Sequence, residues 1–188
     1  MLSNAIDSYL IRKSVEAELA GLDVDFLVEF RPKTLDASKL EFSITCTDNG
    51  AGFADEQIKA FVTKDTSYKD DLAIPGIGRC RGSGRIQFLH YFTMLDVDST
   101  FILAGAPNRR TLHIDDTSVK EVSEQSFVQA DVTDGQTKTT FVLDSIKAEI
   151  YDKFFSSSDL REDFSVDSLK TYVMVSFLQR LVSLKTSL

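Results

Sequence analysis

The sequence has few of the residues that stabilise extracellular or metal-bound domains. Its two cysteines, Cys46 and Cys80, are too few and too isolated for a disulfide framework or a zinc site. We therefore expect reduced thiols and a cytoplasmic location. Cys46 lies on an alternating strand pattern and is predicted to be a small core residue. The two histidines, His90 and His113, are assigned no role.

Long apolar runs and an excess of basic charge are also missing. No run approaches the ~20 residues that cross a bilayer, and the first residues do not form a basic and then apolar leader. The 21 Lys and Arg against 29 Asp and Glu give a formal net charge of −8, which disfavours non-specific DNA binding. We expect no membrane partner and no direct nucleic-acid binding. With 43% hydrophobic and 27% charged residues, the composition is that of a globular domain.

Apolar periodicity predicts an α+β fold. Three regions have helical spacing, together with a short helix near 55–62, and six have strand spacing. The helices are predicted at 2–20, 85–95 and about 165–186, and the strands at 24–30, 40–46, 95–104, 110–115, 126–132 and 139–146. Residues 64–84 have no period and hold four glycines, which is typical of a lid or binding loop, and residues 154–164 break the pattern. The order predicts a two-layer α/β sandwich, with a mostly antiparallel mixed sheet covered on one face by helices.

Residues 48–53, "DNGAGF", directly follow the second predicted strand. Asp-Asn-Gly is a strong turn signal because Asn and Gly tolerate positive φ and Asp bonds to its own backbone. A simple turn therefore accounts for the motif. A second glycine cluster, "RGSGR", places Gly82 and Gly84 directly before a predicted helix. Helix N-termini bind anions, and Arg81 or Arg85 would add positive charge.

A further glycine pair and a polar pair in the first predicted helix are also candidates for ligand binding. The pair Gly76 and Gly78 competes with the later pair for a phosphate-binding role, although only the later pair adjoins a helix. In the first helix, Asn4 and Asp7 share one turn among apolar neighbours. An Asn oxygen there is suited to Mg²⁺, which takes oxygen ligands and phosphates together. The alternative is a surface Asn near a frayed terminus.

Taken in order, "SNAIDS", "DNGAGF", "TSYK", "GSGRIQFL" and "TKTTFVL" resemble the motifs of the GHKL ATPases. This family includes DNA gyrase B subunits, the heat-shock chaperones of ninety kilodaltons, sensor histidine kinases and MutL. The resemblance covers about residues 1–145 and is closest to the chaperone and MutL-like branch. It implies the Bergerat fold, with ATP and Mg²⁺ as ligands. We predict such an ATP-binding domain over residues 1–150. Residues 151–188 are predicted to be a linker and an amphipathic helix that begins a downstream region missing from these 188 residues.

The resemblance also implies roles for particular residues. Asn4 corresponds to the Mg²⁺ ligand, with Asp7 one turn away on the same helix, and Asp48 to the carboxylate that accepts the adenine amino group. Gly50 and Gly52 would keep the pocket wall low. Gly82 and Gly84 would bind phosphates together with Arg85, residues 64–81 (Lys64 included) would form the ATP lid, and Thr139 would support the adenine side. Lys138 stands where the family has Gly, so Thr140 is an alternative to Thr139.

The sequence departs from the hydrolytic members of the family at its first residues. Their general-base Glu lies four residues before the metal-binding Asn, a position that falls immediately before Met1. Either the native chain starts earlier, or this member lacks the base and only binds nucleotide, so no catalytic residue is assigned. Two other readings stay open: a nucleotide switch whose lid controls homodimerisation or docking of a downstream domain, and a scaffold that binds no nucleotide. The last helix either closes the core or docks a missing partner domain.

Overall fold

The computed structural model describes residues 1–188 apart from 34–35, 79–83, 116–121, 134, 155–156 and 187–188. The helices are α1 (Leu2–Val15), α2 (Asp55–Val62), α3 (Tyr68–Asp71), α4 (Gly84–Tyr91), α5 (Ala148–Phe154), α6 (Ser157–Asp163) and α7 (Val166–Thr186). The strands are β1 (Val24–Lys33), β2 (Asp36–Asp48), β3 (Phe92–Leu103), β4 (Ala106–Asp115), β5 (Val128–Ala130) and β6 (Lys138–Ile146). One turn of 3₁₀ helix spans Glu124–Ser126.

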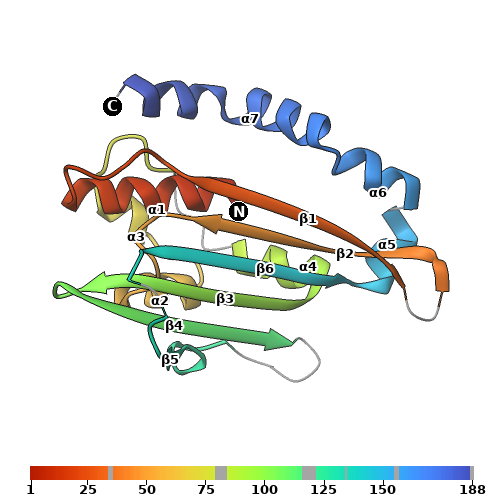
Figure 1. Cartoon of the computed structure of the whole chain (residues 1–188), viewed down its shortest axis with the longest axis horizontal. Helices are drawn as coiled ribbons and strands as arrows, with labels where there is room; N and C mark the ends of the chain where they lie inside the picture. The colour runs from red at the N-terminus through yellow and green to blue at the C-terminus, as the bar shows by residue number, and fades with distance from the viewer. Residues whose placement is uncertain (34–35, 79–83, 116–121, 134, 155–156, 187–188) are drawn as a thin grey trace.

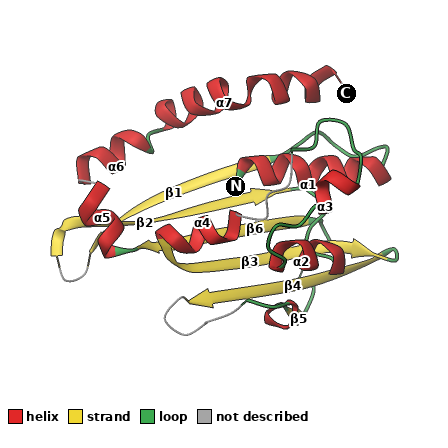
Figure 2. Ribbon diagram, turned by 180° about the vertical axis from the view of Figure 1, so that it is seen from behind, coloured by secondary structure: helices red, strands yellow, loops and turns green. Residues whose placement is uncertain are grey.

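The six strands form one sheet in the order β1-β2-β6-β3-β4-β5. Every neighbouring pair in it is antiparallel. Helices α1, α2 and α4 lie on one face of the sheet, as the two opposite views show, and α7 runs along the β1 side (Figures 1 and 2). The predicted α+β class and two-layer sandwich are confirmed.

The core forms because alternate residues of the central strands point to the helix-covered face. Phe42 of β2, Leu95 and Val97 of β3 and Leu143 of β6 are all buried in one cluster. Further buried members come from β4, α5 and α6: Leu112, Ile114, Ile150, Tyr151 and Leu160. Residues on both sides of the predicted boundary at 150 therefore share one core, and that boundary stays a prediction.

Several predicted boundaries are wrong, each for a local reason. Helix α1 ends at Val15 instead of continuing to residue 20, because the next residues are exposed and offer no apolar stripe to bury. The chain turns from helix to strand at Phe92, since the aromatic and aliphatic residues that fit the helical period also suit a strand. The unpatterned segments 64–84 and 154–164 contain the short helices α3 and α6. The short helix predicted at 55–62 is confirmed as α2.

Helix α7 packs only its inner side toward the domain. Val173 and Phe177 are partly buried, whereas the residues on the opposite side are exposed. Among the described residues, no helix combines the length and apolar character required to cross a bilayer.

Candidate functional site

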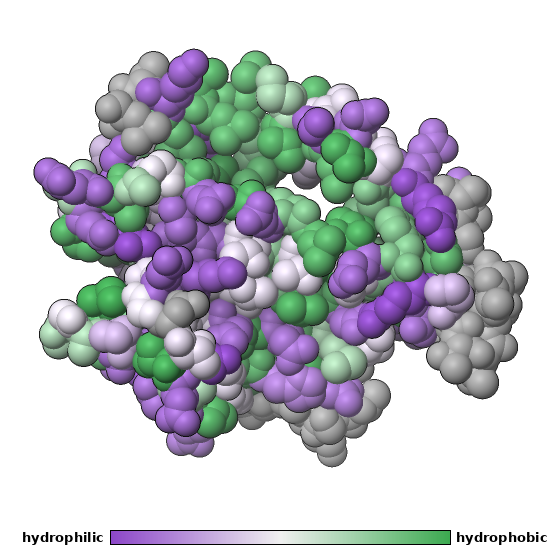
Figure 3. Space-filling view, in the orientation of Figure 1, coloured by the Kyte–Doolittle hydropathy of each residue, from purple (hydrophilic) through white to green (hydrophobic). Residues whose placement is uncertain are grey.

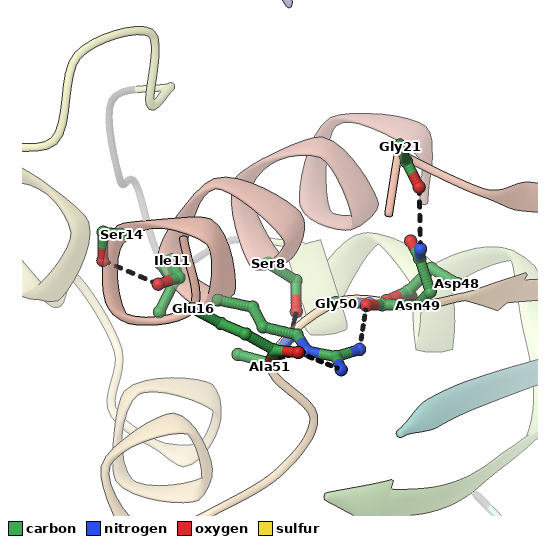
Figure 4. Close-up of polar contacts among 10 residues, drawn as sticks. Ser8, Ile11, Ser14, Glu16, Gly21, Asp48, Asn49, Gly50 and Ala51 are labelled. Carbon is green, nitrogen blue, oxygen red and sulfur yellow. Dashed lines mark hydrogen bonds and ion pairs between the residues drawn. The ribbon is translucent and has the colours of Figure 1, made fainter. Parts of the chain in front are cut away.

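The glycine turn after β2 is fixed to helix α1 by hydrogen bonds (Figure 4). The Ala51 N–H donates to the Ser8 hydroxyl at 2.9 Å and to the Ser8 carbonyl at 3.1 Å. The guanidinium of Arg12, one turn further along α1, donates to the Asn49 carbonyl at 2.9 Å. The Asn49 side chain donates to the Gly21 carbonyl at 2.9 Å. The turn is therefore a built junction between β2, α1 and the start of β1.

Both glycines of this turn are required by close packing. A Cβ on Gly50 would lie 2.3 Å from the Ser8 hydroxyl oxygen and 2.8 Å from a carboxylate oxygen of Asp48. Gly52 has φ +77°, and a Cβ there would lie 2.7 Å from the Phe101 Cβ. The resemblance implies that these glycines leave room for a base, which stays a prediction. The atoms that a Cβ would meet here belong to α1, β2 and β3.

A row of buried polar side chains crosses the sheet beneath the turn. Asp48 of β2 lies directly opposite Thr139 of β6, and Thr139 lies opposite Ser99 of β3. The Thr139 and Ser99 hydroxyls are 2.8 Å apart, and the Ser99 hydroxyl also accepts from the Phe53 N–H at 3.1 Å. All three side chains lie on the face that α1, α2 and α4 cover, so polar groups occupy what would otherwise be core.

The register distinguishes Thr139 from Thr140. Thr140 is paired with Thr47, and their hydroxyls are 3.1 Å apart on the opposite side of the sheet. Successive residues of a strand point to opposite faces, so only Thr139 shares a face with Asp48. Thr139, the residue favoured from the sequence, is therefore the one that lies next to the Asp48 carboxylate. Its role in supporting adenine binding stays a prediction.

Asp48 is a buried carboxyl group with a perturbed pKa. Its side chain accepts the Gly50 N–H at 2.9 Å, and in the described part of the chain this is its one hydrogen bond. Burial raises the pKa of the Asp48 carboxyl to about 6, and the bond from Gly50 partly opposes that rise. A buried carboxylate can accept more donors than this, so Asp48 has capacity for another N–H group.

Cys46, two residues earlier on the same strand, is buried and free, as predicted. Burial, and to a smaller extent the nearby Asp48 carboxylate, raise the pKa of its thiol to about 12. Such a thiol is inert at neutral pH, so Cys46 is a core residue and not a nucleophile.

A second polar cluster centres on Asp7, which is 1% exposed. The ammonium of Lys69, on α3, donates to Asp7 Oδ2 at 2.7 Å and to Asn4 Oδ1 at 3.0 Å. The Gly78 N–H donates to Asp7 Oδ1 at 2.9 Å. Asn4 itself is exposed. The predicted pair on α1 is thus brought together with the segment predicted to be a lid.

Arg180, near the end of α7, completes this cluster. Its guanidinium donates to the Asp7 carboxylate, to the Ser3 hydroxyl at 2.9 Å and to the Gly76 carbonyl at 3.1 Å. Segments far apart in sequence, α1, residues 69–78 and α7, therefore meet at one buried carboxylate. The segment is also tied to α2, because the Gln57 side chain donates to the Tyr68 hydroxyl at 2.7 Å.

For the remaining predicted residues, the structure gives a position in the fold. Lys64 is exposed just beyond α2. Gly84 is the first residue of α4, as predicted for a helix N-terminus, and Arg85 follows it in that helix. Gly82 lies outside the described residues. Sequence reasoning assigned no role to Ser8, Lys69, Ser99 or Arg180. Ser8 and Lys69 had a signal, since they end the motifs "SNAIDS" and "TSYK", whereas Ser99 and Arg180 had none.

The residues present fit a nucleotide and a metal ion in different degrees. Asp48 offers a buried acceptor that suits an amino group, and Asn4 offers one oxygen of the kind that Mg²⁺ prefers. That oxygen accepts the Lys69 ammonium, so a cation already lies beside Asn4 and Asp7. The described residues contain no cluster of three or more His, Cys, Asp or Glu suited to a metal, so phosphate oxygens and water would have to supply the other ligands.

The chain is similar to solved structures, although no family model and no curated protein matches it. Solved structures that are similar include the ATPase and transducer domains of DNA topoisomerase II from Balamuthia mandrillaris, at 17% identity and TM-score 0.46 over 76% of this chain and 34% of that one. The 43K ATPase domain of Thermus thermophilus gyrase B, in complex with an aminocoumarin, has 17% identity and TM-score 0.39 over 86% and 36%. The N-terminal domain of a DNA repair protein has 16% identity and TM-score 0.40 over 93% and 45%.

Two of these three structures are ATPase domains, the kind of domain that the sequence motifs resemble. The chain spans less than half the length of each of the three. With TM-scores below 0.5 these likenesses carry no argument about function, which rests on the residues of the site.

Proposed function

We propose that this chain is the nucleotide-binding domain of a GHKL-type ATPase and binds ATP together with Mg²⁺. The observation that carries the proposal is Asp48, a buried carboxylate that accepts one hydrogen bond from the described residues and is set in a glycine turn fixed to α1. A buried acceptor with spare capacity costs stability unless a ligand donor satisfies it. The same position is the adenine-binding carboxylate in the family that the sequence resembles.

Asp48 would recognise adenine through its exocyclic amino group. That group donates hydrogen bonds, whereas guanine presents a carbonyl oxygen at the corresponding position, which a carboxylate would repel. Thr139 and Ser99 continue the polar row beside Asp48 and would hold the base-binding side in place. A donor on Asp48 would also favour its charged form and lower its raised pKa.

The Asp7 cluster includes Asn4, the residue that the resemblance assigns to the phosphate side of the nucleotide. Asn4 would hold Mg²⁺, which neutralises phosphate charge when it is bound. Lys69 supplies a positive charge beside Asn4, and Gly84 places a helix N-terminus in the same domain. We propose that nucleotide binding changes the contacts of residues 64–81, which would then act as the lid.

A nucleotide-sensing switch without hydrolysis is the second candidate. It is favoured by the direct contact of Lys69 and Gly76 with α1 and α7, since any change in this segment would reach α7 through Arg180. It predicts that ATP alters protease sensitivity of residues 64–78 without release of phosphate.

Calorimetric titration of ATP and GTP into the chain, with Mg²⁺ present, tests the proposal. We expect the chain to prefer ATP by roughly tenfold to a hundredfold, the effect of one well-made or opposed buried hydrogen bond. In Asp48→Asn the ratio of the affinities for ATP and GTP should fall, because an amide can also donate a hydrogen bond to the guanine carbonyl. Asp25→Asn, an exposed acid on β1, is the matched control and should leave the preference unchanged. Equal affinity of the parent chain for ATP and GTP would refute adenine recognition at Asp48. No binding of either would favour a nucleotide-free scaffold.

A further inference from the structure

The outer side of α7 carries an exposed apolar surface. Its large apolar side chains are between 50% and 80% exposed: Val166, Tyr172, Met174, Val175, Leu178 and Val182. Apolar atoms gather along the upper edge of the molecule, over α7 (Figure 3). We call the group Tyr172, Val175, Leu178 and Val182 the outer stripe.

The outer stripe follows helical geometry. At 3.6 residues per turn, Val175, Leu178 and Val182 (i, i+3 and i+7) lie on one side of the helix, with Tyr172 one turn earlier. Val173 and Phe177 are partly buried. They lie seven and three residues before Arg180, whose guanidinium contacts the domain, and the Phe177 ring also contacts that of Tyr172. Helix α7 is therefore apolar on two sides, and its own domain covers one of them. An exposed apolar helix side of this extent marks an interaction surface.

The charges on α7 fit an antiparallel copy of the same helix. Asp167 precedes Ser176 by nine residues and Lys185 follows it by nine, and both side chains are exposed. Their separation of 18 residues corresponds to five full turns, so both lie along the same edge of the helix. In an antiparallel pair centred on Ser176, each Asp167 comes beside Lys185 of the other copy.

Apolar residues follow the same symmetry. Met174 and Leu178 lie two residues on either side of Ser176, on the edge that carries Asp167 and Lys185. An antiparallel copy would therefore bring Met174 beside Leu178 twice, while the outer stripes meet along the centre. In a two-fold symmetric dimer the same patch of each copy forms the interface, so that patch must be complementary to itself. The positions of Asp167, Lys185, Met174 and Leu178 meet this requirement.

We propose that the outer stripe is a self-association surface through which two copies of the chain pair by antiparallel α7 helices. A lipid surface fits less well, because the net charge of −8 opposes approach to anionic membranes. One helix pair buries less than the ~1,600 Å² of a standard interface, so we expect a weak dimer with Kd on the order of 10–100 μM. The surface lies on the side of α7 opposite Arg180 and needs no nucleotide.

Sedimentation velocity of the full chain, from about 1 to 300 μM without nucleotide, tests this surface. We expect the parent chain to dimerise in this range and Val175→Asp to remain a monomer. Val15→Asp is the matched control, because Val15 is an apolar residue at the end of α1 that is 86% exposed, and the substitution introduces the same charge. It should dimerise like the parent.

A charge exchange tests the antiparallel geometry itself. Asp167→Lys or Lys185→Asp alone places like charges together twice in the pair and should weaken association about 5–10-fold. The double variant restores opposite charges and should dimerise within about twofold of the parent. A parent chain that is monomeric at 300 μM overturns the proposal. So does a dimer that Val175→Asp leaves intact, or single charge variants that the double variant does not rescue.

Discussion

Replacement of Asp7 by Asn should both destabilise the domain and loosen the segment at residues 69–78. Asp7 is buried and accepts from Lys69, Arg180 and the Gly78 N–H. An Asn has the same size but no charge, and its NH₂ group would face donors. The two cations would then lie beside each other without a counter-charge.

The magnitude follows from the burial of the partners. Loss of one member of a fully buried ion pair costs about 3–5 kcal/mol. The Asp7 side chain is 2% exposed, but those of Lys69 and Arg180 are 20% and 23% exposed and retain part of their hydration. We therefore expect a loss of roughly 2–3 kcal/mol in the free energy of unfolding. For a chain of this size that corresponds to a Tm lower by about 5–10 °C.

Urea unfolding followed by circular dichroism measures the loss, and hydrogen exchange of residues 69–78 locates it. Asp25→Asn, which removes an exposed carboxylate on β1, is the control and should stay within about 0.5 kcal/mol of the parent. Arg180→Gln should cost less in the Asp7→Asn background than in the parent, because the two residues share one contact. Strictly additive losses, or an Asp7→Asn chain as stable as the parent, would refute the idea that Asp7 joins these segments.

Two further predictions concern the glycine turn. Gly52→Ala should lower the free energy of unfolding by about 3 kcal/mol, because both the positive φ and a Cβ 2.7 Å from the Phe101 Cβ oppose the substitution. Gly105, with φ +80° and open space around it, is the control, and Gly105→Ala should lower the free energy of unfolding by only about 1 kcal/mol in the same urea assay. Equal losses in the two variants would show that the packing at Gly52 is unimportant. The pKa of Asp48 is about 6 in the folded chain against an ordinary 3.8, so the folded state holds its proton longer and stability should fall, by up to roughly 3 kcal/mol, as pH rises from about 4 to about 6. Asp48→Asn should lack this part of the fall, and superimposable pH profiles of the two chains would contradict the assignment.

The fold could be predicted from the sequence where one physical signal dominates. Alternation in "LEFSITC" predicted β2, and helical spacing in "DEQIKAFV" predicted α2. Phe92 shows the limit, because an aromatic residue fits the end of a helical pattern and the start of a strand equally well. The pairing of strands decides between them, and local sequence does not contain it.

The candidate site divides in the same way. The turn at Asp48 follows from the chemistry of Asp, Asn and Gly in sequence. Its position opposite Thr139 depends on the pairing and register of β2 and β6, which the alternation of the two strands does not determine. Arg180 could not be predicted as a partner of Asp7, because 173 residues separate them. A long-range ion pair leaves no local pattern, and a lone arginine on an amphipathic helix is typical of a solvated face.

Calorimetric titration of ATP into the folded chain, with and without Mg²⁺, tests nucleotide binding itself. We expect saturable one-to-one binding below millimolar ATP that weakens when Mg²⁺ is removed and weakens again in Asp48→Asn. Absence of any heat of binding at millimolar ATP, from a sample that circular dichroism shows to be folded, would contradict nucleotide binding.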